Sequence, residues 1–476
     1  MKTTERFVHP LTGRYASEEM SALFSARFKF EAWRRLWLWL AEEERRLGLP
    51  ISEEALGQMR AALTQIDFQA AEREEERTRH DVMAHVRVFG EAAPAARGII
   101  HWGATSAYVS DNGDLIQMRE ALGLIERRLA AVLRILRDFA LAHRDLPALA
   151  YTHFQPAQPT TVGKRAALWA ADLLIDLEEV RRARGDLRFL GAKGATGTQA
   201  SFLLLFDGDS QRVEELDRAL ARRAGFEKRQ LVSGQTYSRK QDDRVVHALS
   251  GLAQSAHKIA TDLRLLQHEG EIEEPFEPSQ IGSSAMPHKR NPMRAERICG
   301  LARHVIALSF DTAMTAATQW LERTLDDSAN KRIAVPEAFL AADAILVLLE
   351  NVFGGLIVHP EVTRRRLEEE IPFLATENVL MEAVRRGGDR QQLHEKLRVH
   401  ARAAADRRAV EGTPPDLLER IAADSAFGMT REELVRVADP VRLIGRSAEQ
   451  VQAFVREELD PALQGVALAE VAPVRV

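Results

Sequence analysis

The sequence predicts an all-α fold organised around a bundle of long helices. Apolar residues recur at helical spacing over stretches several turns long, and charged residues occupy the positions between them. Strand signals are nearly absent, because aromatic residues make up only 6% of the chain and no alternation of β-branched residues persists. Long amphipathic helices with few strands are typical of helix bundles. A chain of 476 residues is too long for a single ordinary core, so we expect two or three domains.

Composition narrows the class of protein and of partner. An apolar content of 45% with 28% charged residues is typical of a globular protein. The formal net charge of −5 gives no basic surface for nucleic acid or for an anionic membrane. Cys299 is the only cysteine, so the chain can form neither an intrachain disulfide nor a thiolate metal cluster. We find neither a signal peptide nor a membrane span and expect a cytoplasmic protein.

Residues 1–111 are predicted to form an N-terminal helical domain. Ser17, followed by two acidic residues, is typical of a helix start. Apolar residues at helical spacing follow, and Gly48 and Pro50 end that run. The stretch 98–112 is too rich in Gly, Ser, Thr and Asn for a helix interior, so we place the domain boundary there.

Residues 112–359 are predicted to form a central domain of long helices. The first runs on from Leu115, where apolar residues mark one face over several turns and arginines occupy the other positions. The helices that follow are expected at residues 160–188, 242–267, 292–320 and 329–353.

Residues 360–476 are predicted to form a small C-terminal helical domain. Its helices are expected to be shorter, because Gly and Pro interrupt the pattern at 387–388, 412–415 and 439–440.

The stretch Gln280–Arg297, QIGSSAMPHKRNPMRAER, has an unusual composition for a loop. Gly, paired Ser, Met, two Pro and Asn occur within eleven positions. Gly282 before two serines gives a backbone that is free to move, while two prolines stiffen the far side. Such a segment can close over a ligand. Its cations, which no acidic block nearby balances, indicate an anionic ligand; they are Lys289, Arg290 and Arg297. A solvated basic loop is the plainer alternative, but it does not require so many special residues within eleven positions.

Two clusters in the first part of the chain carry polar residues suited to binding. One is Arg79-His80-Asp81, with Arg14-Tyr15 upstream as a companion. A His-Asp pair can bind a metal, but without further ligands at suitable spacing a structural pair is equally plausible. The other is HWGATS, residues 101–106, whose hydroxyls and backbone N–H groups precede a helix and suit a carboxylate or a phosphate. An ordinary capping turn is the plainer interpretation.

Two further clusters lie in the central section. The segment Tyr151–Gln158 places His153 on a Pro-containing loop that enters a long helix, where neighbours can fix its tautomer for acid or base work. A lone His is nevertheless more often a satisfied polar group. The run Arg323–Arg332 forms the other cluster, with Gln235 and Lys193 converging from elsewhere. The glycines near Lys193 match neither GxGxxG nor GxxxxGK[ST], so no triphosphate chemistry is indicated.

Several motifs show a family resemblance. GSSAMPHKRNP at 282–292 has the form GSSxMPxKxNP of the fumarase/aspartase superfamily signature, and THFQPAQ at 152–158 has the form THxQxAQ of its second signature. Together with GRY, RHD and RTLDDSANKR, these motifs make the chain most similar to the adenylosuccinate lyase family, and within it to the animal-type subfamily. The resemblance covers almost the whole chain. One departure is His288, where animal-type relatives carry Tyr; bacterial members have His there, so the activity is not put in doubt.

The resemblance implies a fold, an assembly and a reaction. The fold has three helical domains, and the central one is a five-helix bundle that combines with three further copies into the twenty-helix core of a homotetramer. The reaction is β-elimination of fumarate from adenylosuccinate, giving AMP, and from the succinylated aminoimidazole carboxamide ribotide SAICAR, giving AICAR, in purine nucleotide biosynthesis. No metal or organic cofactor is implied. Three subunits contribute to each site, with His153 and Ser283 coming from different chains.

The resemblance also implies catalytic roles. Ser283 is the general base and His153 the general acid, with Lys289 and His80 also in the catalytic set. A hydroxyl is not normally ionised near pH 7, so Ser283 needs Lys289 and backbone N–H groups to stabilise its alkoxide. The residues alone do not distinguish Ser283 from Ser284. A further catalytic candidate either orients His153 or caps a helix, and this is Glu296.

The substrate carries two carboxylates and a phosphate, so its site needs several cations and hydroxyls. The resemblance places these residues at the phosphate and ribose end: Arg14, Tyr15, Arg323, Ser328 and Arg332. It places these at the succinyl end: Thr105, Ser106, Thr152 and Lys289. Beside the purine and the leaving nitrogen it places His80 and His101. The other expected contacts are Arg79, Asp81, Gln235, Asn291 and Arg297.

Two alternative functions were weighed against this one. Another lyase of the superfamily, such as argininosuccinate lyase or fumarase, would not need the GRY, RHD and RTLDDSANKR motifs, which serve a nucleotide. A non-catalytic scaffold, like the superfamily members reused as structural crystallins, would not need an intact His153, Ser283 and Lys289.

Overall fold

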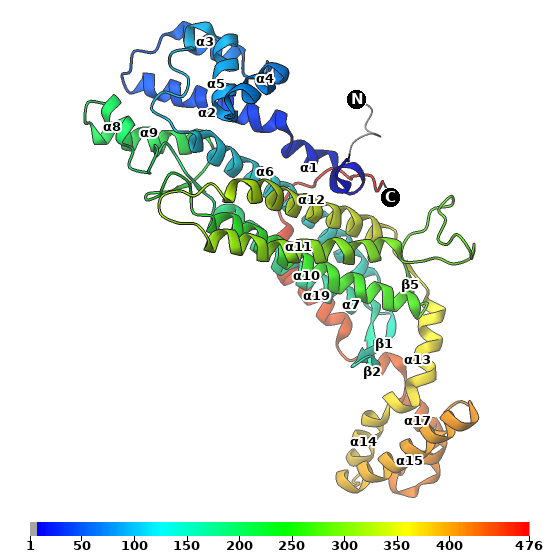
Figure 1. Cartoon of the computed structure of the whole chain (residues 1–476). Coiled ribbons are helices and arrows are strands. Elements are labelled where there is room, and N and C mark those ends of the chain that lie inside the picture. Colours follow the sequence, from blue (N-terminus) through cyan, green and yellow to red (C-terminus); the bar gives the residue numbers. More distant parts are fainter. Residues whose placement is uncertain (1–6, 476) are drawn as a thin grey trace.

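The computed structural model describes residues 7–475 as an elongated, predominantly helical molecule. Figure 1 shows the N-terminal helices at one end, the long helices in the middle and the C-terminal helices at the other end. The predicted all-α class is therefore confirmed.

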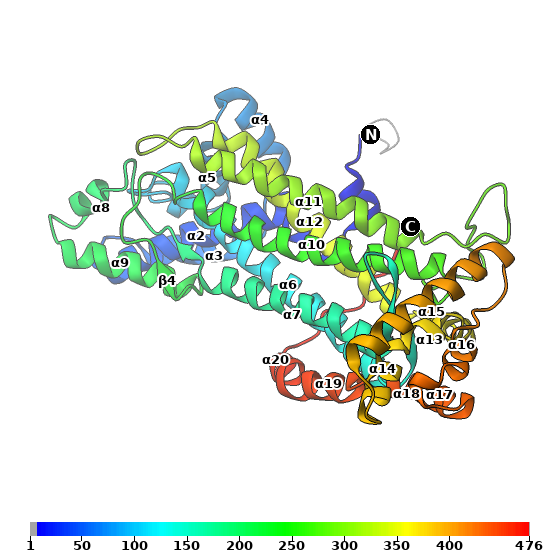
Figure 2. The same ribbon diagram turned by 90° about the horizontal axis from the view of Figure 1, so that it is seen from below.

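Five long helices lie side by side in the middle of the molecule (Figures 1 and 2). They are α6 (Ser106–Ala142), α7 (Val162–Gly185), α10 (Lys240–His268), α11 (Met293–Ala317) and α12 (Asp327–Gly354). The four helices expected after the first all form, with ends within a few residues of the predicted ones, because each carries a broad apolar face that is buried against its neighbours. Two shorter helices, α8 (Ala200–Leu205) and α9 (Ser210–Arg223), lie between α7 and α10 in the sequence.

The N-terminal section is built from helices. They are η2 (Leu11–Tyr15), α1 (Glu18–Leu23), α2 (Ala26–Arg46), α3 (Glu53–Ala61), α4 (Phe68–Thr78), α5 (Asp81–Ala92) and η3 (Pro94–Ala96). In α1 to α5 the side chain of the N-cap residue accepts a hydrogen bond from the first turn. The predicted start at Ser17 is confirmed, since its hydroxyl accepts a hydrogen bond from Met20 N at 3.1 Å.

One expectation about local structure is wrong. Residues 106–112, which we expected outside any helix interior, form the first turns of α6. Tertiary hydrogen bonds decide the outcome here: the Tyr108 hydroxyl donates to Leu36 O at 2.8 Å, and Asn112 Nδ2 donates to Gly191 O at 3.1 Å. The proposed boundary between residues 111 and 112 therefore falls inside a helix.

Short strands form three two-stranded sheets. The strands are β1 (Pro147–Thr152), β2 (Gln155–Thr161), β3 (Arg188–Phe189), β4 (Lys228–Arg229), β5 (Ile272–Glu273) and β6 (Ile357–Val358). In the β1–β2 hairpin, Thr152 pairs with Gln155, so His153 and Phe154 form the turn. Both have positive φ, 55° and 57°, as a two-residue type I′ turn requires. His153 therefore lies at the tip of a hairpin and not, as expected, on a loop at the start of a helix.

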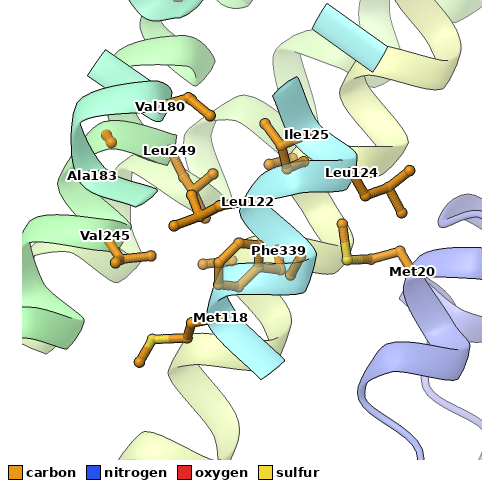
Figure 3. Packing of buried hydrophobic residues seen from close by; sticks show 14 of the residues in the cluster. Met20, Met118, Leu122, Leu124, Ile125, Val180, Ala183, Val245, Leu249 and Phe339 are labelled. Carbon is orange, nitrogen blue, oxygen red and sulfur yellow. The ribbon is translucent and has the colours of Figure 1, made fainter. Parts of the chain in front are cut away.

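Two hydrophobic cores are present. In the main core, α6 packs mainly against α7, α12 and α2. Figure 3 shows Leu122 of α6 pointing towards Leu249 of α10, and Leu124 towards Met20 of α1. The second core includes Leu149 of β1 and is built mainly from α13 (Pro360–Leu374), α14 (Thr376–Arg385), α15 (Arg390–Glu411), α16 (Leu417–Ala423), η4 (Ser425–Phe427) and α17 (Arg431–Val437).

The end of the chain returns to the bundle. After α18 (Pro440–Leu443), the chain forms α19 (Ser447–Phe454), η5 (Val455–Leu459) and α20 (Asp460–Leu463). Val451 and Leu459 belong to the main core, and Arg181 of α7 donates to Ala462 O at 2.9 Å. The predicted C-terminal section 360–476 thus contributes to both cores, and the division into 1–111, 112–359 and 360–476 stays a prediction.

Among residues 7–475, no helix combines the length and the apolar character needed to cross a membrane.

A buried ion pair connects three helices of the main core. Arg128 of α6 donates to Asp343 Oδ1 of α12 at 2.7 Å, and the other carboxylate oxygen accepts from Ser17 N at 2.7 Å at the start of α1. The exposed fractions of Arg128 and Asp343 are 1% and 0%. Burial raises the pKa of Asp343 above its ordinary value, although Arg128 opposes that rise.

Replacing Asp343 with Ala should therefore destabilise the protein by about 3 to 5 kcal/mol. It removes the buried carboxylate that pairs with Arg128 and leaves this guanidinium only Glu19, at 3.8 Å, and Glu470 O, at 3.2 Å, among the described contacts. The measurement is the free energy of unfolding in urea at fixed protein concentration. Asp138→Ala is the matched control, since it removes an exposed partner of Arg137 and should cost less than about 1 kcal/mol. Equal losses in the two variants would contradict the role given to the buried pair.

Candidate active site

A cavity of about 900 Å³ opens where α4, α5 and the N-terminal ends of α6 and α12 meet. It brings together predicted site residues that are far apart in the sequence. They are Arg79, His80, Asp81, Thr105, Ser106, Gln235, Arg323, Ser328 and Arg332.

The two ends of the RHD motif are held by different helices. Arg79 ends α4 with a left-handed backbone, φ 57°, which is uncommon for a large side chain and turns the chain sharply before α5. Asp81 at the start of α5 pairs with Arg332 of α12 at 3.0 Å. The motif therefore connects two walls of the cavity.

His80 has a defined proton arrangement when its ring is neutral. Its Nδ1 accepts from Met83 N at 3.3 Å and caps α5, so the proton lies on Nε2. That nitrogen lies 3.4 Å from Ser106 Oγ. His80 thus presents a polar edge to the cavity beside a hydroxyl.

The N-terminus of α6 faces the same cavity. Thr105 is its N-cap residue, but its side chain caps no backbone N–H, so the hydroxyl remains available to a ligand. Helix N-termini attract anions through their free N–H groups and the helix dipole. The Thr105 side chain therefore does not form the ordinary capping turn that was the alternative for this segment.

The floor of the cavity is a buried ionic network that the sequence did not reveal. Arg239 pairs with Asp111 at 3.0 Å, and Lys331 pairs with Asp114 at 2.9 Å and donates to the Tyr237 hydroxyl at 2.9 Å. Burial alone would raise the pKa of Asp111, but Lys331 and Arg239 together hold it below its ordinary value. These residues come from three separate helices or their ends, and only Lys331 lies in a motif that the sequence marks, the run Arg323–Arg332.

His101 and Lys193, which were also candidates, do not line this cavity. His101 Nδ1 accepts from Trp37 Nε1 at 2.9 Å, and burial lowers the pKa of His101 to about 4, so this ring is neutral at pH 7. Lys193 is buried against Asp217 at 2.6 Å. The expectation that Lys193 converges with Arg323–Arg332 is wrong, because this ion pair holds its ammonium group elsewhere.

The signature loop lies at the other end of the bundle, beside β5 (Figure 1). Ser283 Oγ accepts from Met286 N at 3.1 Å, and Asn291 Nδ2 donates to Gly282 O at 2.7 Å across the loop. A Cβ atom on Gly282 would lie 2.2 Å from Lys289 O, so the glycine permits a close approach of two backbone segments.

The charge of this loop is partly balanced, contrary to expectation. Arg290 pairs with Glu273 at 3.2 Å. Glu274 accepts from Arg294 N at 2.9 Å and from Ala295 N at 3.0 Å, so its carboxylate caps α11. We expected Glu296, in the first turn of α11, either to orient His153 or to cap a helix. At α11 the cap is provided by Glu274.

Arg14, Tyr15 and Arg297 form a third group. Both guanidinium groups lie near the Tyr15 ring, at 6.0 Å for Arg14 and 5.9 Å for Arg297. Burial lowers the pKa of Arg297, with the neighbouring Arg14 adding to that effect. Two adjacent cations at one aromatic ring suit an anion between them.

The structure therefore divides the predicted residues of one chain among several places. The β1–β2 hairpin lies, like the signature loop, at the opposite end of the long helices from the cavity (Figure 1). The predicted residues outside the cavity are Arg14, Tyr15, His101, Thr152, His153, Ser283, Lys289, Asn291, Glu296 and Arg297. Within residues 7–475 no three His, Cys, Asp or Glu side chains are grouped so as to bind a metal.

Comparisons with known proteins show which family the chain belongs to. Residues 27–307 match the family described as Lyase, and residues 372–454 match the family described as Adenylosuccinate lyase C-terminus. The chain is 51% identical to adenylosuccinate lyase of Saccharomyces cerevisiae, over 98% of this chain and 97% of the relative. It is 48% identical to adenylosuccinate lyase of Schistosoma mansoni, over 97% of each chain.

A solved structure shows the same fold. The crystal structure of fumarate lyase from Mesorhizobium sp. BNC1 superposes with a TM-score of 0.81 at 26% identity, covering 95% of this chain and 99% of the other. The motifs of the cavity, the hairpin and the loop all lie within the matched lengths. The chain therefore belongs to the adenylosuccinate lyase family and has the fumarase/aspartase fold.

Proposed function

We propose that this chain catalyses β-elimination of fumarate from adenylosuccinate, giving AMP, and from SAICAR, giving AICAR, in purine nucleotide biosynthesis. The observation that carries the proposal is the cavity of this lyase-family chain, where Arg79, Arg323 and Arg332 surround the open N-terminus of α6. A substrate with two carboxylates and a phosphate is well matched to such a site. No metal or organic cofactor is part of the proposal, and the single cysteine is compatible with work in the cytoplasm.

The chemistry requires a base, an acid and stabilisation of a dianionic intermediate. In this proposal Ser283 removes the proton from the carbon beside a carboxylate, and His153 protonates the departing nitrogen. The intermediate carries extra charge on that carboxylate, which N–H donors and cations must stabilise. Lys289, Asn291 and the backbone at Gly282 are suited to this, and Lys289 also favours the serine alkoxide.

We also propose that several copies of the chain complete each site. One chain holds the cavity apart from the hairpin and the signature loop, so a full set of groups requires other subunits. Bundle helices carry exposed apolar side chains that a second copy would cover: Ile175 on α7 is 61% exposed and Phe310 on α11 is 72% exposed. A homotetramer with a twenty-helix core provides both the cover and the missing groups.

The substrate assignment is tested by absorbance assays on purified protein. Adenylosuccinate should be cleaved, with a change in absorbance as AMP forms, whereas argininosuccinate and malate should give no turnover. Activity on either of these two without activity on adenylosuccinate would point to another lyase of the superfamily. Inactivity on all three would favour a scaffold.

Replacing Ser283 with Ala should lower kcat by roughly 10²- to 10⁴-fold, the usual contribution of a general base. Substrate binding should remain measurable, because the cationic groups stay in place. Ser284→Ala is the matched control and should keep near-normal turnover. The opposite pattern, with loss only in Ser284→Ala, would show that the neighbouring hydroxyl is the base.

Shared sites predict complementation between inactive variants. When His153→Ala and Ser283→Ala subunits are dissociated, mixed equally and reassembled, about a quarter of sites should receive both intact residues. Activity should rise towards that fraction of wild type. Persistent inactivity, once native gels have shown mixed tetramers, would mean that both residues come from one chain, and it would leave the lyase assignment standing.

A further inference from the structure

A buried carboxylate lies beneath the hairpin that carries His153. Glu271, between α10 and β5, is 1% exposed. Its Oε1 accepts from the Tyr151 hydroxyl at 3.4 Å, and its Oε2 lies 3.7 Å from Arg165 Nη1 of α7. Arg366 of α13 approaches the same carboxylate at 3.6 Å. Glu271 therefore joins the bundle, the hairpin and the C-terminal helices.

Tyr151 connects this carboxylate to the turn. Its ring lies 5.7 Å from the ring of Phe154, the turn residue next to His153. Phe154 is 52% exposed, and this ring contact links it to the residue that binds Glu271. His153 and Phe154 both hold positive φ, a conformation that costs free energy for such residues and persists only where the surroundings enforce it.

The strand before the turn is fixed by the same residues. Arg165 Nη2 donates to Leu149 O at 2.7 Å, and the Leu149 side chain is buried in the second core. Of the two arginines that face Glu271, Arg165 therefore also fixes β1. Tyr151 lies two residues after Leu149 in the same strand, and its hydroxyl contacts Glu271.

We propose that Glu271 is a positioning residue for catalysis, acting through Tyr151 and Phe154 to fix the orientation of His153 in its own chain. This inference rests on the proposed role of His153 as general acid. Because His153 and Ser283 of one chain would serve different sites, Glu271 would tune the site that receives its His153 and not the site that receives its Ser283.

The acidic residues next to Glu271 in the sequence bind other parts of the structure, so the contact with the hairpin is specific to Glu271. Glu273 and Glu274 bind Arg290 and the N-terminus of α11, so they hold the signature loop. Acids within one short segment therefore serve the hairpin and the loop separately. On α13, Glu368 is exposed and pairs with Arg364 at 2.7 Å, so its charge is balanced by a residue of neither group.

Steady-state kinetics test the positioning role. Glu271→Ala and Tyr151→Leu should each lower kcat by roughly 10- to 100-fold with little change in KM, as expected when a proton donor is displaced but binding groups remain. Glu271→Gln and Tyr151→Phe, which keep shape or ring, should recover part of the loss. Glu368→Ala, which removes an exposed acid paired with Arg364, is the matched control and should stay close to wild type. Near-normal kcat in both Glu271→Ala and Tyr151→Leu would overturn the proposal, and the tyrosine variant decides the matter if Glu271→Ala does not fold.

Mixed assemblies test which site is affected. Equal mixing of Glu271→Ala with Ser283→Ala should restore activity towards a quarter of wild type, because some sites then combine an intact hairpin with an intact serine. Mixing Glu271→Ala with His153→Ala should restore nothing beyond the residual activity of Glu271→Ala. The reverse pattern would assign Glu271 to the signature loop and overturn the proposal.

The mixture of His153→Ala with Ser283→Ala tests the shared-site model separately from the role of Glu271. If that mixture fails to complement, the shared-site model fails, while the kinetic comparison of Glu271→Ala with Glu368→Ala still decides the positioning role. If it complements and the Glu271→Ala mixtures show no difference between partners, the effect of Glu271 is general and the proposal is wrong.

Discussion

The length of the bundle helices is the constraint on which the rest of the structure depends. Helix α6 has 37 residues, so at about 1.5 Å per residue it is roughly 55 Å long. Its N-terminus opens into the cavity, and at its other end His143 O accepts from Gly163 N at the start of α7, just after the hairpin. His153 is thus held about one helix length from Thr105 by a rod that cannot shorten. In the shared-site model proposed above, copies of the chain in one assembly bring such groups together.

The cavity separates charges that stabilise the fold from charges available to a ligand. Its floor pairs Arg239 and Lys331 with buried aspartates, so these cations are already neutralised. At the rim, Arg323 lies 3.8 Å from Asp327, whose carboxylate is shared with Arg239. The rim cation is therefore only partly compensated. Cations fixed in this way need little reorganisation when an anion arrives, which is the condition for strong electrostatic stabilisation in a desolvated site.

The sequence predicts those parts of this molecule that repeat a local pattern. The long helices follow from apolar periodicity, and the start at Ser17 follows from its capping chemistry. The hairpin was missed because Gln, Pro and Ala in β2 give no alternating strand pattern, and its partner strand is fixed by Leu149 packing into a distant core. The ionic floor was missed because residues such as Asp111 and Arg239 meet only after folding. The roles of His153 and Ser283 rest on family signatures, since a lone His or Ser carries no local mark of catalysis.

The signature loop has less freedom than its glycine and serines suggest. Glu274, before the loop, caps α11, after the loop, so one carboxylate holds both of its ends together. Within the loop, Asn291 binds Gly282 O, and Gly282 has no room for a side chain beside Lys289 O. Gly282 is therefore required for close packing of the loop base and not for a hinge. Any closure over a ligand must take place in the segment between Gly282 and Asn291. This segment carries Ser283 and Lys289. Because these contacts fix the base of the loop, the conformational entropy lost on closing is confined to the segment 283–290.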